Sequence, residues 1–273
     1  VYVLSGSSEA NTAGGIAVRA GSSAPAEGGK VTVSAGDTEG AEDSHGGSIA
    51  ISAGEASGGA GGIVNLVGGA SDQASGGTVN IATGRSTEAV DGSYSSGDLT
   101  VSTPESQSET GALEFCTGAA DGSPTSQQHS GAIVVTTGDT TDGSAGEITI
   151  EGGTSEGLAS AVEFTAGDSA EGDGGSISLF AGNSQSAEGS EGGAVTLSAG
   201  ESTSIGGNVI LNSGEGATTS GDITAGTAPS SLSGDVLIDT GASQGTSGDL
   251  SVAVGDTHGD ASTGGGVSLT AGD

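Results

Sequence analysis

The chain has 273 residues, of which 57 are glycine, two are tyrosine and three are phenylalanine, while tryptophan and methionine are absent. Large apolar side chains supply most of the buried area of an ordinary domain, so this composition excludes a thick globular core. The formal charge of −32, from 35 acidic against three basic residues, makes nucleic acid and anionic membranes poor partners.

One short segment recurs along the whole chain in the form Gly-Gly-x-Φ-x-Φ-x-(Ala/Thr)-Gly, where Φ is an aliphatic residue, as at 28–36 and 46–54. Low hydrophobicity with high charge is typical of disordered chains, but disorder does not keep such a register. The first Φ of each copy is Val1, Ile16, Val31, Ile49, Val64, Val79, Leu99, Leu113, Ile133, Ile148, Val162, Ile177, Val195, Val209, Ile223, Val236, Leu250 or Val267.

Each Φ-x-Φ alternation predicts a short strand with one buried face, and the flanking glycines predict corners that need positive φ angles. One segment cannot bury its own apolar face, whereas stacked neighbours can. The sequence therefore predicts an all-β fold, a short-coil parallel β-solenoid of 18 repeats, mostly of 14–15 residues, without helices. One repeat per coil is favoured, and two repeats per coil with facing sheets is the alternative. The predicted core comprises Val31, Val33, Ile49, Ile51, Val79, Ile81, Ile177, Leu179, Val195, Leu197, Val267 and Leu269.

The connections between copies vary, and the longest fall at 39–44, 89–95 and 123–129. These insertions should bulge outward, while the copy at Ile223 is interpreted as contracted. A small residue, such as Thr38 or Ser169, stands two places after each closing glycine. We expect it to point inward and its hydroxyl to bond the backbone of the next coil. Residues 1–273 are predicted to form a single continuous array that is part of a longer solenoid or a filament protomer.

In nine of the eighteen copies a carboxylate follows the closing position, which is glycine in eight of them and Pro104 before Glu105 in the ninth. If the copies stack, these residues form a broken line, and Ca²⁺ prefers several oxygen ligands. The favoured interpretation is solubility, with loosely bound Ca²⁺ and no specific metal site or cofactor. The candidates for weak cation contacts are Asp37, Glu55, Asp139, Asp168, Glu201, Glu215 and Asp256.

Several short motifs suggest catalysis, and each is better explained by the repeat. The loop Asp239-Thr240-Gly241 looks like that of aspartic proteases, but that chemistry needs two carboxylates and only Asp239 departs from the repeat consensus. Gly-x-Ser-x-Gly occurs at 153–157 and 241–245 without the strand-to-helix turn that a nucleophile elbow requires. His45, His129, His258 and Cys116 share no common phase of the repeat. No catalytic residue and no enzymatic activity are predicted.

The copies resemble the tandem Gly-Gly-x-Val-x-Leu-x-Ser/Ala-Gly segments of Gly/Ser-rich surface proteins of diatoms and other stramenopile algae, as residues 174–182 illustrate. The resemblance covers essentially the whole chain and implies a large secreted or surface protein, with no catalytic or binding residue carried over.

We expect a non-enzymatic structural protein: an acidic β-solenoid rod that forms or decorates an extracellular filament, flagellar hair, sheath or cell-wall coat. The expected partners are further copies joined head to tail, or a continuation of the solenoid, without membrane insertion. The alternative is a cell-surface binding module for ice, polysaccharide or divalent cations. The outward Thr and Ser residues favour ice binding, but charges such as Arg19, Glu163 and Asp239 interrupt them.

Overall fold

The computed structural model describes residues 1–9, 12–24, 27–39, 44–86, 95–120, 129–141, 143–186, 189–257 and 263–271. These residues contain no helix, as expected, but they also contain no strand. The prediction of an all-β fold, and of a β-solenoid in particular, is therefore wrong. The chain divides into two units, Val1–Thr136 and Thr137–Asp273, and the division falls inside the copy that begins at Ile133.

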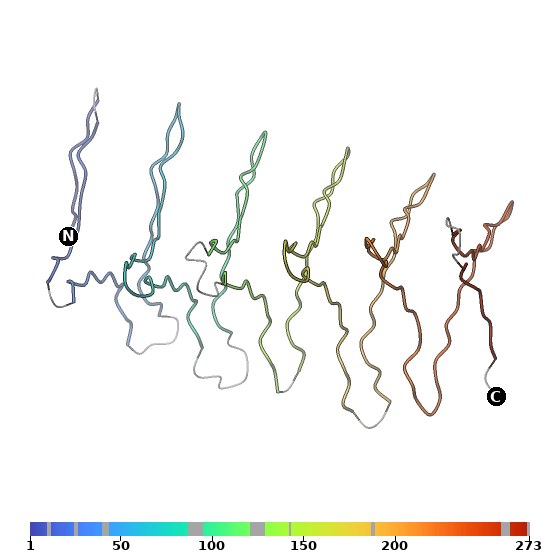
Figure 1. Cartoon of the computed structure of the whole chain (residues 1–273). Coiled ribbons are helices and arrows are strands. Elements are labelled where there is room, and N and C mark those ends of the chain that lie inside the picture. Colours follow the sequence, from blue (N-terminus) through green and yellow to red (C-terminus); the bar gives the residue numbers. More distant parts are fainter. Residues whose placement is uncertain are drawn as a thin grey trace. The chain divides into compact units, whose positions relative to one another are not determined.

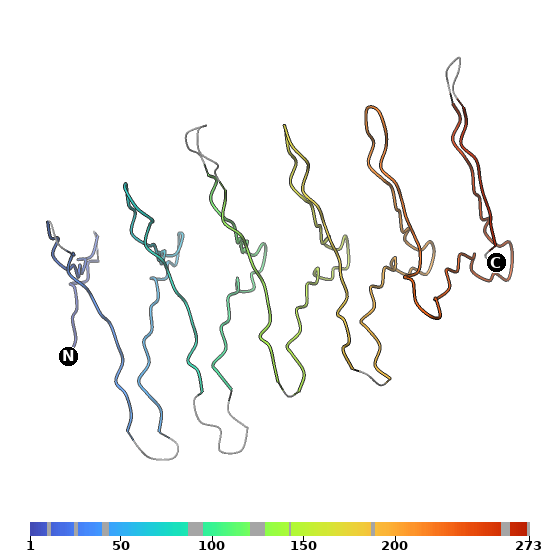
Figure 2. The same ribbon diagram turned by 60° about the horizontal axis from the view of Figure 1, so that its bottom comes forward.

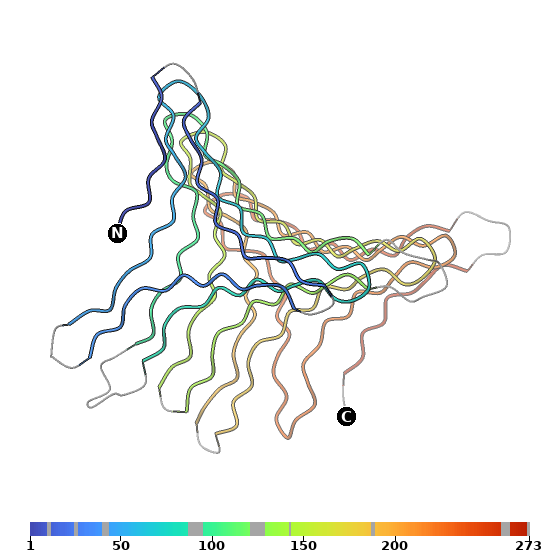
Figure 3. The same cartoon turned by 90° about the vertical axis from the view of Figure 1, so that its left-hand side faces the viewer.

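Within each unit the chain runs outward along one copy, turns through an arc and returns along the next copy (Figure 1). The same alternation is visible in each unit from other directions (Figures 2 and 3). A β-ladder needs pairs of N–H and C=O groups bonded along both segments. Here the backbone bonds between successive copies occur singly, at the base of the arc, as from Gly29 N to Gly21 O at 2.9 Å. One bond for each arc fixes a turn but does not make a sheet.

The side chains that were predicted to form the core are exposed, and no hydrophobic side chain is buried in the described part of the chain. The exposed fraction of Val31 is 52%, and that of Leu269 is 89%. Even the two apolar positions of one copy are unequal, since Val33 is 73% exposed against 52% for Val31. The correction covers all of Val31, Val33, Ile49, Ile51, Val79, Ile81, Ile177, Leu179, Val195, Leu197, Val267 and Leu269.

The total accessible surface shows how little the chain buries. It is 27015 Å² for 25.1 kDa, whereas a compact monomer of this mass exposes about 10,000 Å² and the extended chain about 36,000 Å². Ordering a backbone residue costs about 1–2 kcal/mol, which burial on this scale does not offset. Local contacts, and not a core, therefore define the described structure. It includes no helix that is long and apolar enough to cross a bilayer.

Candidate functional site

The feature that recurs most regularly is the junction between one copy and the next. We call the fifth residue after the first Φ the closing residue, and the residue just before it the seat residue. The opening residue lies two places before the first Φ of the following copy, and the arc runs from the closing to the opening residue. For Val31 these are Gly36, Ala35 and, in the next copy, Gly47. The seat and opening residues are neighbours at every junction, from Ser5 and Gly14 to Val254 and Gly265.

Junctions with an alanine seat are tight. Gly47 N donates to Gly36 O at 2.9 Å, and a Cβ added to Gly47 would lie 3.1 Å from both Ala35 Cβ and Gly36 N. Real Cβ atoms seldom come so close to backbone, so a side chain here would force the two copies apart. The same bond, at 2.8–2.9 Å, closes the junctions of Gly29, Gly62, Gly175, Gly193 and Gly207.

Junctions with a threonine seat are looser. A Cβ on Gly146 would lie 3.5 Å from Thr137 Cγ2, and one on Gly131 would lie 3.5 Å from Thr117 Cγ2. Those distances are ordinary van der Waals contacts. No backbone bond joins Gly146 to Gly138 or Gly131 to Gly118, although all four are described residues. The approach is thus closer at alanine seats than at threonine seats, and among the threonine seats in the described residues only Thr83 permits the backbone hydrogen bond, from Gly97 N to Gly84 O at 3.0 Å.

Close approach, rather than backbone torsion, explains the opening glycines. Positive φ angles were predicted at the glycines that flank each copy. Among the described residues they occur instead at Gly143 and Gly189, with φ of 107° and 67°, and both lie within arcs. An opening residue such as Gly175 must lack a side chain, because a Cβ at this position would lie too close to backbone atoms of Gly167.

The small residue that follows each closing glycine by two places starts the arc. Ser169 Oγ accepts a hydrogen bond from Gly172 N at 2.8 Å, and Ser71 Oγ accepts one from Ala74 N at 3.0 Å. Ser184, Ser202 and Ser243 accept similar bonds from the backbone N–H two residues later. These residues are exposed and bond to their own arc, so the expectation that they point inward and bond the next coil is wrong. Their role is that of a serine turn, in which the hydroxyl replaces a backbone acceptor.

The junction is insensitive to the length of the arc. The bond from Gly207 N to Gly200 O spans seven residues, and the bond from Gly97 N to Gly84 O spans thirteen. Closing the longer arc costs only about 0.5 kcal/mol more by chain entropy. The insertions at 39–44 and 89–95 therefore leave their junctions closed. Of the predicted outward bulges, residues 40–43, 89–94 and 123–128 lie outside the described residues.

The copy that begins at Ile223 is the shortest, with 13 residues to Val236, yet it keeps the seat position of the other copies. Its seat residue is Thr227, whose Cγ2 would lie 3.7 Å from a Cβ on Gly234, in the arrangement seen at the other threonine seats. Ala228 therefore occupies the closing position, which is glycine in every other copy except that of Leu99, where it is Pro104.

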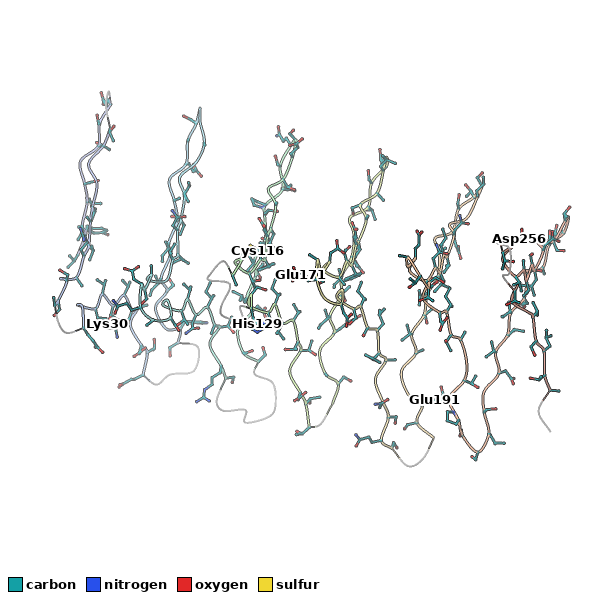
Figure 4. The ribbon with its side chains drawn as sticks, in the orientation of Figure 1. Lys30, Cys116, His129, Glu171, Glu191 and Asp256 are labelled. Carbon is teal, nitrogen blue, oxygen red and sulfur yellow. The ribbon has the colours of Figure 1, made fainter. Side chains whose placement is uncertain are left out.

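The candidate cation ligands are not gathered into a site. No group of three or more His, Cys, Asp or Glu side chains in the described residues could hold a metal ion. Figure 4 shows Glu171, Glu191 and Asp256 on separate segments of the C-terminal unit. Asp37, Glu55, Asp139, Asp168, Glu201 and Glu215 are likewise exposed. Cys116 is a free, exposed thiol, while His258 lies outside the described residues.

The residues of the motifs that suggested catalysis take part in junctions or arcs. Thr240 is a seat residue against Gly248, and Ser243 Oγ accepts from Gly245 N at 3.1 Å. In the Gly-x-Ser-x-Gly motif at 153–157, Ser155 Oγ accepts a hydrogen bond from Gly157 N at 3.0 Å. The described residues enclose no pocket.

Comparison with known proteins adds no relative: no family model, curated protein or solved structure matches the chain. The junction is therefore described from this chain alone. Sequence reasoning recorded the Ala or Thr before each closing glycine and the glycine before each Φ, but it did not pair them across the arc. One signal in the sequence could have revealed the pair. In the junction of Gly152 and Ser160, glycine replaces the usual alanine or threonine at the seat, and serine replaces the usual glycine at the opening position.

Proposed function

We propose that the chain is a non-enzymatic structural protein, an acidic repeat chain that forms or decorates an extracellular filament, flagellar hair, sheath or cell-wall coat. The observation that supports it is the recurrence of one junction at every boundary between copies. A long series of equivalent joints favours a repetitive material over a protein organised around a single site. The resemblance to algal surface proteins supports the extracellular location.

Further copies of the same chain are the partner that we propose. Each copy leaves its aliphatic side chains exposed, as Val195 at 52% and Leu197 at 68% illustrate. Burying one such side chain fully contributes about 1.5–3 kcal/mol, so association would recover stability that the single chain lacks. The charge of −32 opposes it, but salt screens charges over about 10 Å at 0.1 M. We therefore expect association to increase with ionic strength and with divalent cations held loosely around the carboxylates.

Sedimentation velocity at increasing salt, with electron micrographs of the native material, tests the proposal. The expected result is faster sedimentation in salt and continuous filaments or sheets. Replacing Ile177, Leu179, Val195 and Leu197 with serine should weaken association, because the apolar pairs of two copies are lost. Replacing the neighbouring Ser178, Thr196 and Ser198 with alanine is the matched control and should not. A chain that stays monomeric in all salt, with isolated particles in micrographs, would contradict the proposal.

A further inference from the structure

One junction is closed by a side chain instead of the backbone. The opening residue is glycine in every copy from Ile16 onward except the copy that begins at Val162, where it is Ser160. Ser160 Oγ donates a hydrogen bond to Gly153 O, the closing carbonyl, at 3.2 Å. At the following junction the same role falls to the backbone, from Gly175 N to Gly167 O at 2.9 Å.

The seat residue is adapted to this exchange. It is Gly152, and a Cβ added there would lie 2.8 Å from Ser160 Oγ and 3.1 Å from Ser160 O. The serine therefore occupies the space that an alanine or threonine side chain fills at other seats. At this junction the space between the seat and opening residues therefore holds one side chain, that of Ser160, and leaves no room for a second one at position 152.

A second junction with a glycine seat shows that Ser160, and not Gly152, changes the closure. Gly68 is the seat opposite Gly77, and the backbone bond from Gly77 N to Gly69 O forms there at 2.8 Å. A seat without a side chain thus permits ordinary closure. The junction of Gly153 and Ser160 differs from it by the opening side chain.

We propose that Ser160 is a site at which phosphorylation opens the arc between Gly153 and Ser160. Transfer of a phosphoryl group from a nucleoside triphosphate forms an Oγ–P bond, breaks the bond to the departing diphosphate and releases the hydroxyl proton. The oxygen that donated to Gly153 O then has no proton to donate. The added phosphate carries a charge of about −1.5 to −2 and only strong acceptors, which face a carbonyl acceptor.

The surroundings favour this role. Ser160 is exposed, so its hydroxyl can be reached. The arc also contains Glu156, whose carboxylate would repel a phosphate. Backbone-closed junctions offer no equivalent, because the N–H of Gly175 or Gly77 is not a phosphoryl acceptor. This inference concerns one joint and holds whether or not copies of the chain associate.

Spin labels on either side of the arc test it in the full chain. Cysteines at Glu151 and Glu163 carry the labels, with Cys116→Ser removing the native thiol, and electron double resonance gives the distribution of their separation. Ser160→Ala should broaden it, as the closed-to-open ratio falls about 2- to 10-fold on loss of one hydrogen bond. Phosphoserine at 160 should broaden it further. Ser160→Thr keeps the hydroxyl and should retain the wild-type distribution.

Ser160→Gly distinguishes loss of the hydroxyl hydrogen bond from a general disruption of the junction. It recreates the pair of Gly68 and Gly77, so the backbone N–H of residue 160 should bond to Gly153 O and the distance distribution should be narrow again. Labels at Thr165 and Ser178, across the next arc, should not respond to any change at Ser160. A wild-type distribution in both Ser160→Ala and the phosphoserine chain would overturn the proposal. So would a threonine variant as broad as the alanine variant.

Discussion

The tight and loose junctions predict opposite effects for the same substitution, Gly→Ala, at two opening residues. A Cβ on Gly175 would lie 3.2 Å from Ala166 Cβ and 3.2 Å from both N and O of Gly167. Since these are fixed backbone atoms, Gly175→Ala should separate the copies and break the bond from residue 175 N to Gly167 O. A Cβ on Gly146 would meet only Thr137, at 3.5 Å, and Gly146→Ala should be accommodated.

The magnitudes follow from two opposing terms. Loss of the backbone bond costs about 0.5–1.5 kcal/mol, whereas alanine restricts the open chain and favours closure by about 0.4–1 kcal/mol where its side chain fits. At Gly175 the side chain does not fit, so only the first term acts and the closed-to-open ratio should fall about two- to ten-fold. At Gly146 only the second term acts, and the local structure should be unchanged or slightly more ordered.

Amide hydrogen exchange measured by NMR checks this directly. In the unmodified chain, the N–H of Gly175 should exchange more slowly than that of Gly146, relative to the intrinsic rate for each sequence. In Gly175→Ala the N–H of residue 175 should lose its protection, while Gly193 in the next tight junction keeps its own. Equal, unprotected exchange at Gly175 and Gly146 in the unmodified chain would refute the reasoning.

Two further predictions concern the arcs. Ser169→Ala removes the acceptor of Gly172 N, so the N–H of Gly172 should exchange about two- to ten-fold faster; Ser169→Thr should preserve its protection, and unchanged exchange in the alanine variant would show that the turn is not formed. Six Gly and Ser residues inserted between Gly200 and Gly207 lengthen that arc from seven to thirteen, the natural span of Gly84 to Gly97. Closure should weaken by about 0.5 kcal/mol, so the protection of Gly207 should fall only about two-fold, and complete loss of protection would contradict the independence of junction and arc.

The sequence predicted the repeat, its register and the position of the arcs, because these depend on local residue patterns. Gly and a hydroxyl residue mark the start of most arcs, and the structure places a serine turn there at Ser169 and Ser202. The insertions were correctly placed between copies, since chain entropy makes a longer arc inexpensive.

The prediction of strands failed because alternation says which side chains share a face but not whether another segment covers that face. Val31 and Val33 alternate with polar residues as in a strand with one buried face, yet they are 52% and 73% exposed. A ladder also requires successive backbone bonds, and each arc closes with one. The junction pair was missed because its partners, such as Ala35 and Gly47, are separated by an arc of variable length.

The backbone hydrogen bonds between copies are not spread evenly along the described residues. Backbone-closed junctions form two runs, from Gly14 to Gly97 and from Gly175 to Gly221, where the seats are mostly alanine, serine or glycine. Between the runs lie the seats Thr103, Thr117 and Thr137 and the serine-closed junction of Ser160, none with a backbone bond. The division between the two units, after Thr136, falls in this interval. Threonine seats without a backbone hydrogen bond are therefore concentrated around the division of the chain, although Thr83, in the first run, permits the bond from Gly97 N to Gly84 O at 3.0 Å.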